Sequence, residues 1–395
     1  MHASPPRALI TGITGQDGSY LAEMLLAKGW EVHGVVRREA LEDPAHRLVN
    51  IIGIRDKIRL HAANIDNPLS LYKIVSDVRP NQCYHLAASS FVSYAFDDEN
   101  TILSHNFSAT HYLLSSLKEL APECRLYFAG SSEMFGAPDE FPQNEKSRFN
   151  PRSLYGISKL ASYHLVANYR RQHGLFACTG ILYNHESPRR GFEYVTRKIT
   201  SAAAKIHLGL SDRLELGNMS ARRDWGYAPE YVRAMVAMLE RDAPDDYVIA
   251  TGLLHSVEDV LRMAFAAVGK DYKQFVEVNE QYGIALAQDA AFEISLRIRI
   301  KIDAQAAAAD EQHFLRVMHL AGNRVMHVRR DHLARRMPHI AQLLRQLRLG
   351  KKMNPRLAER GAHDDGQQLP VMVDALDHPV KPPISAAPLV LKYRR

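Results

Sequence analysis

The sequence predicts an α/β fold in which a doubly wound parallel sheet is followed by a smaller, mixed α/β lobe and a divergent C-terminal segment. Three observations support this prediction. Apolar runs alternate regularly with amphipathic helical patterns over the first 180 residues. These runs lack polar alternation, as expected for strands buried between two layers of helices. The composition, with 46 % apolar and 24 % charged residues, allows a sizeable hydrophobic core.

The expected elements follow one another in strand–helix order. Strands are expected at residues 7–12, 31–38, 82–88, 125–132 and 176–184, and helices at 19–29, 71–80, 101–120 and 153–174. Residues 187–282 hold two further helical patterns, at 197–210 and 231–242, with short strands between them. We therefore predict a Rossmann-type domain over residues 1–183, a substrate lobe over 184–282, and a basic C-terminal segment over 283–395.

Composition excludes several classes of protein. No apolar run approaches the ~18–20 residues that cross a bilayer, and no apolar stretch precedes the first strand, which argues against a signal peptide. Cys83, Cys124 and Cys178 form neither a disulfide framework nor a metal-ligand pattern, and they suit a reducing cytoplasm. Residues 324–360 hold 11 Lys plus Arg against two Asp plus Glu, so this segment alone has a net charge of +9. Because the whole chain has a net charge of +6, the rest of the chain has about −3. A nucleic-acid partner is therefore not expected.

A glycine-rich turn after the first strand predicts a dinucleotide site. Gly12, Gly15 and Gly18 recur at every third position between the expected strand and the expected helix. Glycine lets the backbone approach a pyrophosphate, and the helix N-terminus favours its negative charge. We expect the whole turn to contact the cofactor: Gly12, Ile13, Thr14, Gly15, Gln16, Asp17 and Gly18.

The end of the second strand favours NADP over NAD. An acidic residue there would hold the ribose hydroxyl of NAD, whereas this sequence has Arg37 and Arg38. Two guanidiniums suit a 2′-phosphate through bidentate hydrogen bonds; the alternative is a solvated basic pair, and the adjoining Glu39 weakens the case for NADP slightly. After the strand at 82–88, small residues would let the nicotinamide half lie close to the backbone: Leu86, Ala87, Ala88, Ser89 and Ser90.

Tyr155 and Lys159 predict a proton-transfer site. They lie four residues apart on an expected helix and so share one face. A nearby ammonium would lower the pKa of the phenol, and a bound, positively charged nicotinamide would add to this effect. The tyrosine could then accept a proton from a sugar or alcohol hydroxyl. Such a pair is common by chance, but with the glycine turn and a serine-ending strand it indicates nicotinamide-dependent chemistry.

Several segments in the same order resemble the extended short-chain dehydrogenase/reductase family, and within it the GDP-mannose 4,6-dehydratases. They are TGITGQDGSYLAEMLL, GSSEMFG, YGISK, NHESPRRG, VTRKIT, LGN and RDWG, and the resemblance spans residues 7–282. It implies a homo-oligomeric enzyme, a dimer or tetramer, that converts GDP-D-mannose to GDP-4-keto-6-deoxy-D-mannose through bound NADP and without a metal.

The resemblance also implies roles for individual residues. Tyr155 would take the O4 proton, and Glu133 would remove the C5 proton and help water leave from C6. Ser131 stands at the family's catalytic threonine and would hydrogen-bond the substrate near O4. Lys159 joins the implied cofactor contacts with Asn64, Ile65, His185 and Arg190, and the implied substrate contacts are Ser90, Glu133, Asn184, Lys198 and Arg223.

Structural roles are the alternative for some of these residues. Glu133 could be a helix-capping carboxylate, and His185 could be a packed loop histidine. Arg189, Arg190 and Arg223 could be surface charges, and Arg189 is the one for which we favour that interpretation.

The sequence departs from the family's pattern at Asn64, Thr101 and Met134–Phe135, and most strongly after Tyr282. The family has a Tyr-Arg-Pro segment there, whose arginine would hold the diphosphate. We therefore expect residues 283–395 to be non-homologous, through a frameshift or an added domain. Two alternatives follow: a catalytically impaired NADP- and nucleotide-sugar-binding homologue, or a dehydratase acting on another nucleotide sugar.

Overall fold

The computed structural model describes residues 4–89 and 99–279 of the chain. The chain divides into two units, Met1–Asp331 and His332–Arg395, and every described element belongs to the first. Ser90 and the C-terminal segment predicted at residues 283–395 lie outside the described residues. None of the described helices is long and apolar enough to span a membrane.

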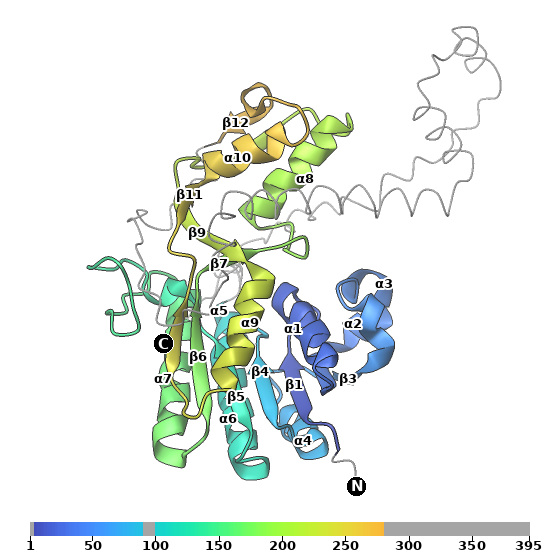
Figure 1. The fold of residues 1–395 in the computed structure, drawn as a ribbon, viewed down its shortest axis with the longest axis vertical. Helices are drawn as coiled ribbons and strands as arrows, with labels where there is room; N and C mark the ends of the chain where they lie inside the picture. The colour runs from blue at the N-terminus through green and yellow to red at the C-terminus, as the bar shows by residue number, and fades with distance from the viewer. Residues whose placement is uncertain (1–3, 90–98, 280–395) are drawn as a thin grey trace, which may run out of the picture. The chain divides into compact units, whose positions relative to one another are not determined.

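The described strands form one large sheet of seven parallel strands (Figure 1). Its order is β10-β6-β5-β4-β1-β2-β3, so the chain runs outward from β1 in one direction and from β4 in the other. The carboxyl ends of β1 and β4 therefore flank the point where the strand order reverses, which is where ligands bind in such sheets. The strands are β1 (Arg7–Thr11), β2 (Glu31–Val36), β3 (Ile58–Ala62), β4 (Gln82–His85), β5 (Arg125–Ala129), β6 (Ala177–Leu182) and β10 (Asp246–Ile249).

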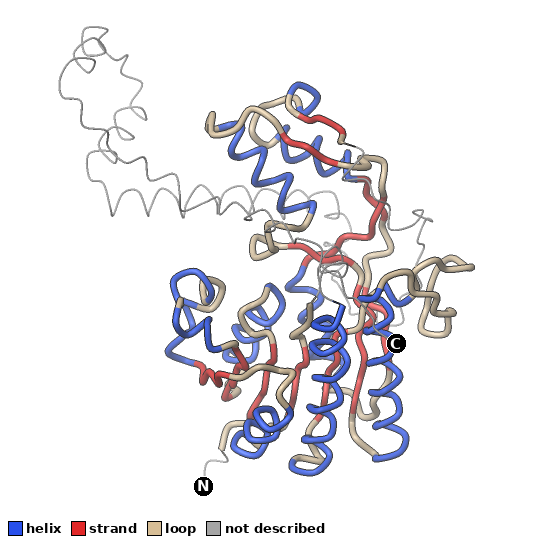
Figure 2. Tube along the Cα trace, turned by 180° about the vertical axis from the view of Figure 1, so that it is seen from behind, coloured by secondary structure: helices blue, strands red, loops and turns tan. Residues whose placement is uncertain are grey.

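Helices cover both faces of this sheet (Figure 2). Successive strand residues point to opposite faces, so Ala8 and Ile10 pack in one core cluster, while Leu9 packs in the other. The first cluster includes α1 (Gln16–Ala27) and α9 (Ala228–Leu239), and the second includes α4 (Pro68–Val78), α6 (Ala109–Leu120) and α7 (Leu154–His173). Shorter helical segments connect them: α2 (Arg38–Glu42), α3 (Pro44–Arg47), η1 (Ile52–Lys57), α5 (Glu99–Leu103), η3 (Ser104–Ser108) and η4 (Ser132–Met134).

A smaller lobe carries its own core. Its three-stranded sheet has the order β11-β9-β7, in which β9 pairs in parallel with β7 and antiparallel with β11. A second pair of parallel strands, β8 and β12, lies beside two helices that share one apolar cluster. The elements are β7 (Asn184–Glu186), α8 (Val195–His207), β8 (Leu214–Leu216), β9 (Arg222–Tyr227), β11 (Leu254–Ser256), α10 (Val257–Ala266), η5 (Tyr272–Gln274) and β12 (Val276–Val278).

The structure differs from the sequence prediction in four places. The edge strand β3 and the helix α10 have no counterpart among the expected elements. The helix expected at 101–120 is divided into α5, the π-helical η3 and α6. Residues 228–249, which the predicted division places in the substrate lobe, supply α9 and β10, and β10 pairs with β6 in the large sheet.

Candidate active site

The glycine turn forms a backbone cradle at the carboxyl end of β1. Gly12 has a positive φ of 76°, and a Cβ added there would lie 2.9 Å from the backbone nitrogen of Ala87. A Cβ on Gly18 would lie 2.3 Å from the backbone oxygen of Gly12. Gly15 is the N-cap of α1 and brings no side chain to the helix's first N–H groups. The turn therefore fits the close approach of a pyrophosphate to a helix N-terminus.

A buried polar chain fixes the ends of β1 and β4 beside this turn. The Thr11 hydroxyl accepts hydrogen bonds from the backbone nitrogens of Leu86 (3.2 Å) and Ala87 (3.1 Å) and lies 2.8 Å from Nδ1 of His85. Nε2 of His85 lies 3.1 Å from the Thr110 hydroxyl. Burial lowers the pKa of His85 to about 3, so its ring is neutral and bridges the two hydroxyls. Sequence reasoning missed Thr11 and His85, whose roles depend on which strands are neighbours.

The residues expected to hold the adenosine half lie at neighbouring strand ends. Arg37 is the N-cap of α2 and Arg38 is its first residue, directly after β2, and both are exposed. Asn64 follows β3 and is exposed, while Ile65 packs against the core. The structure therefore places these four residues at the carboxyl edge that also carries the glycine turn.

The catalytic residues expected from the sequence come together after β5 and at the start of α7. The Ser131 hydroxyl accepts a hydrogen bond from the backbone nitrogen of Glu133 (3.2 Å) and so begins the η4 turn. A Cβ on Gly156 would lie 2.5 Å from the backbone oxygen of Glu133, so the first turn of α7 packs directly on this segment. That packing brings Tyr155 within hydrogen-bonding reach of Ser131.

Burial affects the pKa of both Tyr155 and Lys159. Burial raises the pKa of Tyr155, and the hydrogen bond with Ser131 only partly opposes this. The Nζ of Lys159 donates to the backbone oxygen of Ala129 (2.8 Å) and lies 5.9 Å from the centre of the Tyr155 ring. Burial also lowers the pKa of Lys159 to about 7. Desolvation dominates the pKa of both groups here, and the lowering of the phenol's pKa by the ammonium and a bound nicotinamide stays a prediction.

Glu133 has the properties of a base. Burial raises the pKa of its carboxyl group, and the positive charge of Arg223 opposes this rise. A raised pKa makes a carboxylate more basic and brings it closer to the pH at which a general base works best. Arg223 lies on β9, and burial lowers its pKa while Glu133 opposes the change, so it is not a surface charge.

The other two residues expected to contact the substrate also lie in the smaller lobe. Asn184 begins β7, and Lys198 lies in the first turns of α8. Burial lowers the pKa of Lys198, and Glu215 opposes this effect.

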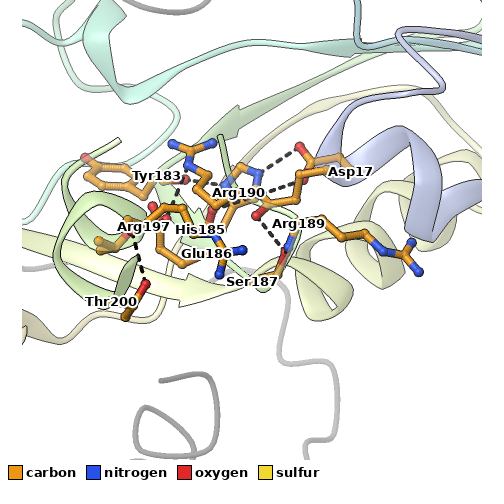
Figure 3. Close-up of polar contacts among 11 residues, drawn as sticks. Asp17, Tyr183, His185, Glu186, Ser187, Arg189, Arg190, Arg197 and Thr200 are labelled. Carbon is orange, nitrogen blue, oxygen red and sulfur yellow. Dashed lines mark hydrogen bonds and ion pairs between the residues drawn. The ribbon is translucent and has the colours of Figure 1, made fainter. Parts of the chain in front are cut away.

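His185 lies between two hydrogen-bonding partners (Figure 3). Its Nε2 lies 2.8 Å from Oδ2 of Asp17, its Nδ1 lies 2.7 Å from the backbone oxygen of Tyr183, and its ring stacks on Tyr231. Burial alone would lower the pKa of His185, but Asp17 raises it above its ordinary value. Burial would likewise raise the pKa of Asp17, but His185 lowers it. Sequence reasoning identified both residues without their pairing.

The side chains of Arg189 and Arg190 are largely shielded from solvent and paired with carboxylates, so neither is a free surface charge. Arg189 donates to the Ser19 hydroxyl (2.9 Å) and to Glu23 (2.5 Å), which joins its loop to α1. The side chain of Arg190 is 18 % exposed, and its Nε lies 3.2 Å from Oε2 of Glu186. Sequence reasoning missed Glu186, although it stands inside the NHESPRRG segment.

Comparisons with known proteins agree with this architecture. The model of the family described as GDP-mannose 4,6 dehydratase matches residues 9–320. The match extends past Tyr282, to residue 320. GDP-mannose 4,6 dehydratase 2 of Caenorhabditis elegans is 46 % identical over 271 residues, which are 67 % of this chain and 71 % of that protein. GDP-mannose 4,6 dehydratase of Homo sapiens is 46 % identical over 269 residues, or 67 % and 72 % of the two chains.

Solved structures of more distant proteins share the fold. UDP-glucose 4-epimerase of Thermotoga maritima, with UDP-glucose, has a TM-score of 0.67 at 18 % identity and covers 81 % of this chain and 99 % of its own. The dTDP-glucose 4,6-dehydratase of Bacillus anthracis, in complex with NAD, has a TM-score of 0.64 at 18 % identity, with coverages of 80 % and 96 %. Identity at this level shows the fold alone. The sequence relatives go further: the chain belongs to the GDP-mannose 4,6-dehydratase family.

Proposed function

We propose that this protein dehydrates GDP-D-mannose to GDP-4-keto-6-deoxy-D-mannose with NADP as its resident cofactor. The family supports a dehydratase. The observation that carries the proposal is Glu133: a partly buried carboxylate with a raised pKa beside Ser131 and Tyr155. A dehydrogenase acting only at one carbinol needs the hydroxyl and the phenol. A second base is needed only where a carbon–hydrogen bond next to a carbonyl must also break.

The chain's own residues supply the proton transfers. When bound, the nicotinamide would supply a reversible hydride acceptor. Ser131 would hydrogen-bond O4 of the sugar, and Tyr155 would accept the O4 proton as C4 becomes a ketone. The ketone makes the C5 proton acidic, so Glu133 can remove it. The same carboxyl group can then protonate the C6 hydroxyl, which leaves as water. Return of the hydride to C6 and addition of one proton at C5, which replaces the proton that Tyr155 took from O4, would give the 4-keto-6-deoxy product and balance the reaction.

The nucleotide half of the substrate would meet the smaller lobe. Lys198 on α8 and Arg223 on β9 provide two cations for the diphosphate, and Asn184 on β7 provides an amide beside the sugar. Both cations are partly desolvated, which strengthens their attraction for an anion. Arg223 also interacts electrostatically with Glu133, so Arg223 would connect the diphosphate with the base.

The proposal is tested by incubating the purified chain with GDP-mannose and NADP⁺ and following the sugar nucleotide by mass spectrometry. Loss of one water from GDP-mannose is the expected result. If the mass stays unchanged while NADP⁺ remains bound, the chain is an impaired binder or acts on another sugar nucleotide. Other GDP- and CDP-hexoses offered in the same assay would separate these two outcomes.

The preference for NADP gives a separate prediction. Arg37→Ala and Arg38→Ala are each expected to raise the Kd for NADP⁺ about tenfold or more, because a charge-assisted hydrogen bond to phosphate is worth roughly 1.5–3 kcal/mol. The Kd for NAD⁺, which lacks the 2′-phosphate, should stay unchanged. Calorimetric titration of nucleotide-free protein measures both constants.

The control for this experiment is Lys28→Ala, which removes a positive charge at the opposite end of α1. It should leave both Kd values unchanged. If the arginine variants raise the Kd for NADP⁺ and the Kd for NAD⁺ equally, Arg37 and Arg38 do not bind the 2′-phosphate.

The oligomeric state stays a prediction. Leu103, Phe107 and Ile157 are exposed on the neighbouring segments α5, η3 and α7. An apolar face of this kind suits a second copy of the chain. Sedimentation velocity of the purified protein measures the state directly.

A further inference from the structure

The segment between β6 and α8, which includes β7, is hydrogen-bonded to the N-terminus of α1 at several points. Nε2 of Gln16 donates to the backbone oxygen of His185 (3.0 Å), and the Ser187 hydroxyl donates to Oε1 of Gln16 (2.8 Å). His185 also pairs with Asp17 at 2.8 Å. Gln16 and Asp17 are the first two residues of α1, where the pyrophosphate would lie. These contacts therefore fix the segment to the N-terminus of α1.

The same segment is connected to α8, the helix that carries Lys198, through the carboxylate of Glu186. Oε2 of Glu186 accepts a hydrogen bond from the Thr196 hydroxyl (2.5 Å) and lies 3.2 Å from Nε of Arg190. The guanidinium of Arg190 lies 3.5 Å from the ring centre of Tyr194. Tyr194 is the N-cap of α8, and Thr196 is its second residue. Figure 3 shows Glu186 and Arg190 between the His185–Asp17 pair and the start of α8.

The Glu186 carboxylate contacts two residues that belong to different expected binding sites. Arg190 is an expected cofactor contact, whereas Thr196 stands two residues before Lys198, an expected substrate contact. The side chain of Glu186 is 8 % exposed and that of Arg190 is 18 % exposed, so the charges lie away from bulk water. A buried charge that loses its partner is strongly penalised. Any shift of Arg190 is therefore expected to move Glu186, and with it the first turn of α8.

We propose that Glu186 is a positioning residue that couples cofactor binding at Arg190 to nucleotide-sugar binding on α8. The proposal rests on the proposed function, because it takes its two ligands from it. NADP that engages Arg190 would fix Glu186, and Glu186 would hold Thr196 and the substrate helix in the binding arrangement. Because coupling between two binding sites is reciprocal, GDP bound on α8 must raise the affinity for NADP⁺ by the same factor. With an unchanged association rate, this higher affinity is observed as slower release of NADP⁺.

The experiment measures release of labelled NADP⁺ from purified holoenzyme after mixing with excess unlabelled NADP⁺, with and without saturating GDP. GDP is expected to slow release about tenfold in the unmodified chain, which is within the usual range of such couplings. Thr196→Val removes the hydroxyl but keeps the shape, and should reduce the factor to below about twofold. Glu186→Gln, which keeps the side-chain size and removes the charge, should do the same independently.

Two variants serve as controls. Thr196→Ser keeps the hydroxyl and should restore the full effect of GDP. Thr200→Val removes a buried hydroxyl one turn further along α8, where it donates to the backbone oxygen of Arg197 (3.2 Å), and should leave the effect intact. A purely structural role for Thr196 would instead lower the thermal stability of Thr196→Val and leave its GDP factor unchanged.

The outcomes separate this inference from the proposed function. An undiminished GDP factor in Thr196→Val or Glu186→Gln overturns the coupling, as does the absence of any GDP effect in the unmodified chain. If the unmodified chain dehydrates GDP-mannose without a GDP effect on NADP⁺ release, only the coupling fails. If GDP slows release but GDP-mannose is not dehydrated, the coupling stands and the proposed reaction fails.

Discussion

Replacing Glu133 with glutamine is expected to stop water loss from GDP-mannose while oxidation at C4 remains possible. Glutamine has the same shape but cannot accept the C5 proton, and general-base catalysis contributes about 10²–10⁴-fold to such a step. The turn itself should survive, because Ser131 holds the backbone nitrogen of residue 133 rather than its side chain. Mass spectrometry should show the substrate less two hydrogens, in at most one equivalent per site, and little of the dehydrated product.

Two further variants make this result specific. Tyr155→Phe should block the first oxidation as well, so that the sugar nucleotide keeps its original mass. Glu140→Gln changes an exposed carboxylate seven residues further along the chain and should have no effect. Water loss at an undiminished rate in Glu133→Gln would remove Glu133 from the mechanism and return it to the helix-capping role considered as the alternative.

Much of the site could be predicted because its parts follow strands. The glycine turn follows β1, Arg37 follows β2, Ala87 follows β4, and Ser131 follows β5. Parallel strands end at one edge of the sheet, so a pattern that predicts parallel strands also predicts that these segments gather there. No measured distance is needed for that inference, and the fold is enough.

What the sequence could not predict depends on contacts between distant segments. His185 and Asp17 are separated by 168 positions, and only the packing of the loop on α1 makes them an ion pair. Burial raises the pKa of Tyr155, and the i,i+4 spacing of Tyr155 and Lys159 does not reveal this burial.

Part of the fold had the same difficulty. The strand β10 has only four residues, Asp246–Ile249, of which three are apolar, and so short a run carries no signal for the sheet that it joins. The π-helical turn η3 interrupts a pattern that reads as one helix, and its Asn106 is buried among hydrogen bonds to Ser89 and Ser158. These bonds reach the neighbouring helix and the end of β4, so the interruption is set by tertiary partners.

Lys159→Met removes an expected cofactor contact and is expected to stabilise the folded chain near neutral pH. Lys159 is 3 % exposed, and burial lowers its pKa from 10.5 to about 7. A shift of that size corresponds to a cost of at most about 5 kcal/mol for burying the charged lysine. Methionine avoids this cost but leaves the backbone oxygen of Ala129 without its donor, which costs roughly 1–3 kcal/mol. A net gain of about 2–4 kcal/mol should remain at or below neutral pH.

The pH dependence of this gain distinguishes buried charge from simple packing. Below pH 7 the lysine is protonated in both states, and the full cost is present. Between pH 7 and 10.5 the unfolded chain binds more protons at this site than the folded chain, so the stability of the unmodified protein rises with pH. The advantage of methionine should therefore shrink across this window and reverse near its upper end, where only the lost hydrogen bond remains.

Urea unfolding of the two nucleotide-free proteins at about pH 6 and about pH 10 measures this difference. Other buried groups, such as Cys83 and Tyr84, also titrate differently in the folded and unfolded states, but they are present in both proteins and cancel in the comparison. Lys28→Met, which changes an exposed lysine, should show no such dependence. A stability difference that stays constant with pH would mean that Lys159 is not buried as a destabilised cation. A difference that shrinks with rising pH would mean that burial of charged Lys159 lowers the free energy of unfolding. The fold would then retain a destabilising lysine at an expected cofactor contact.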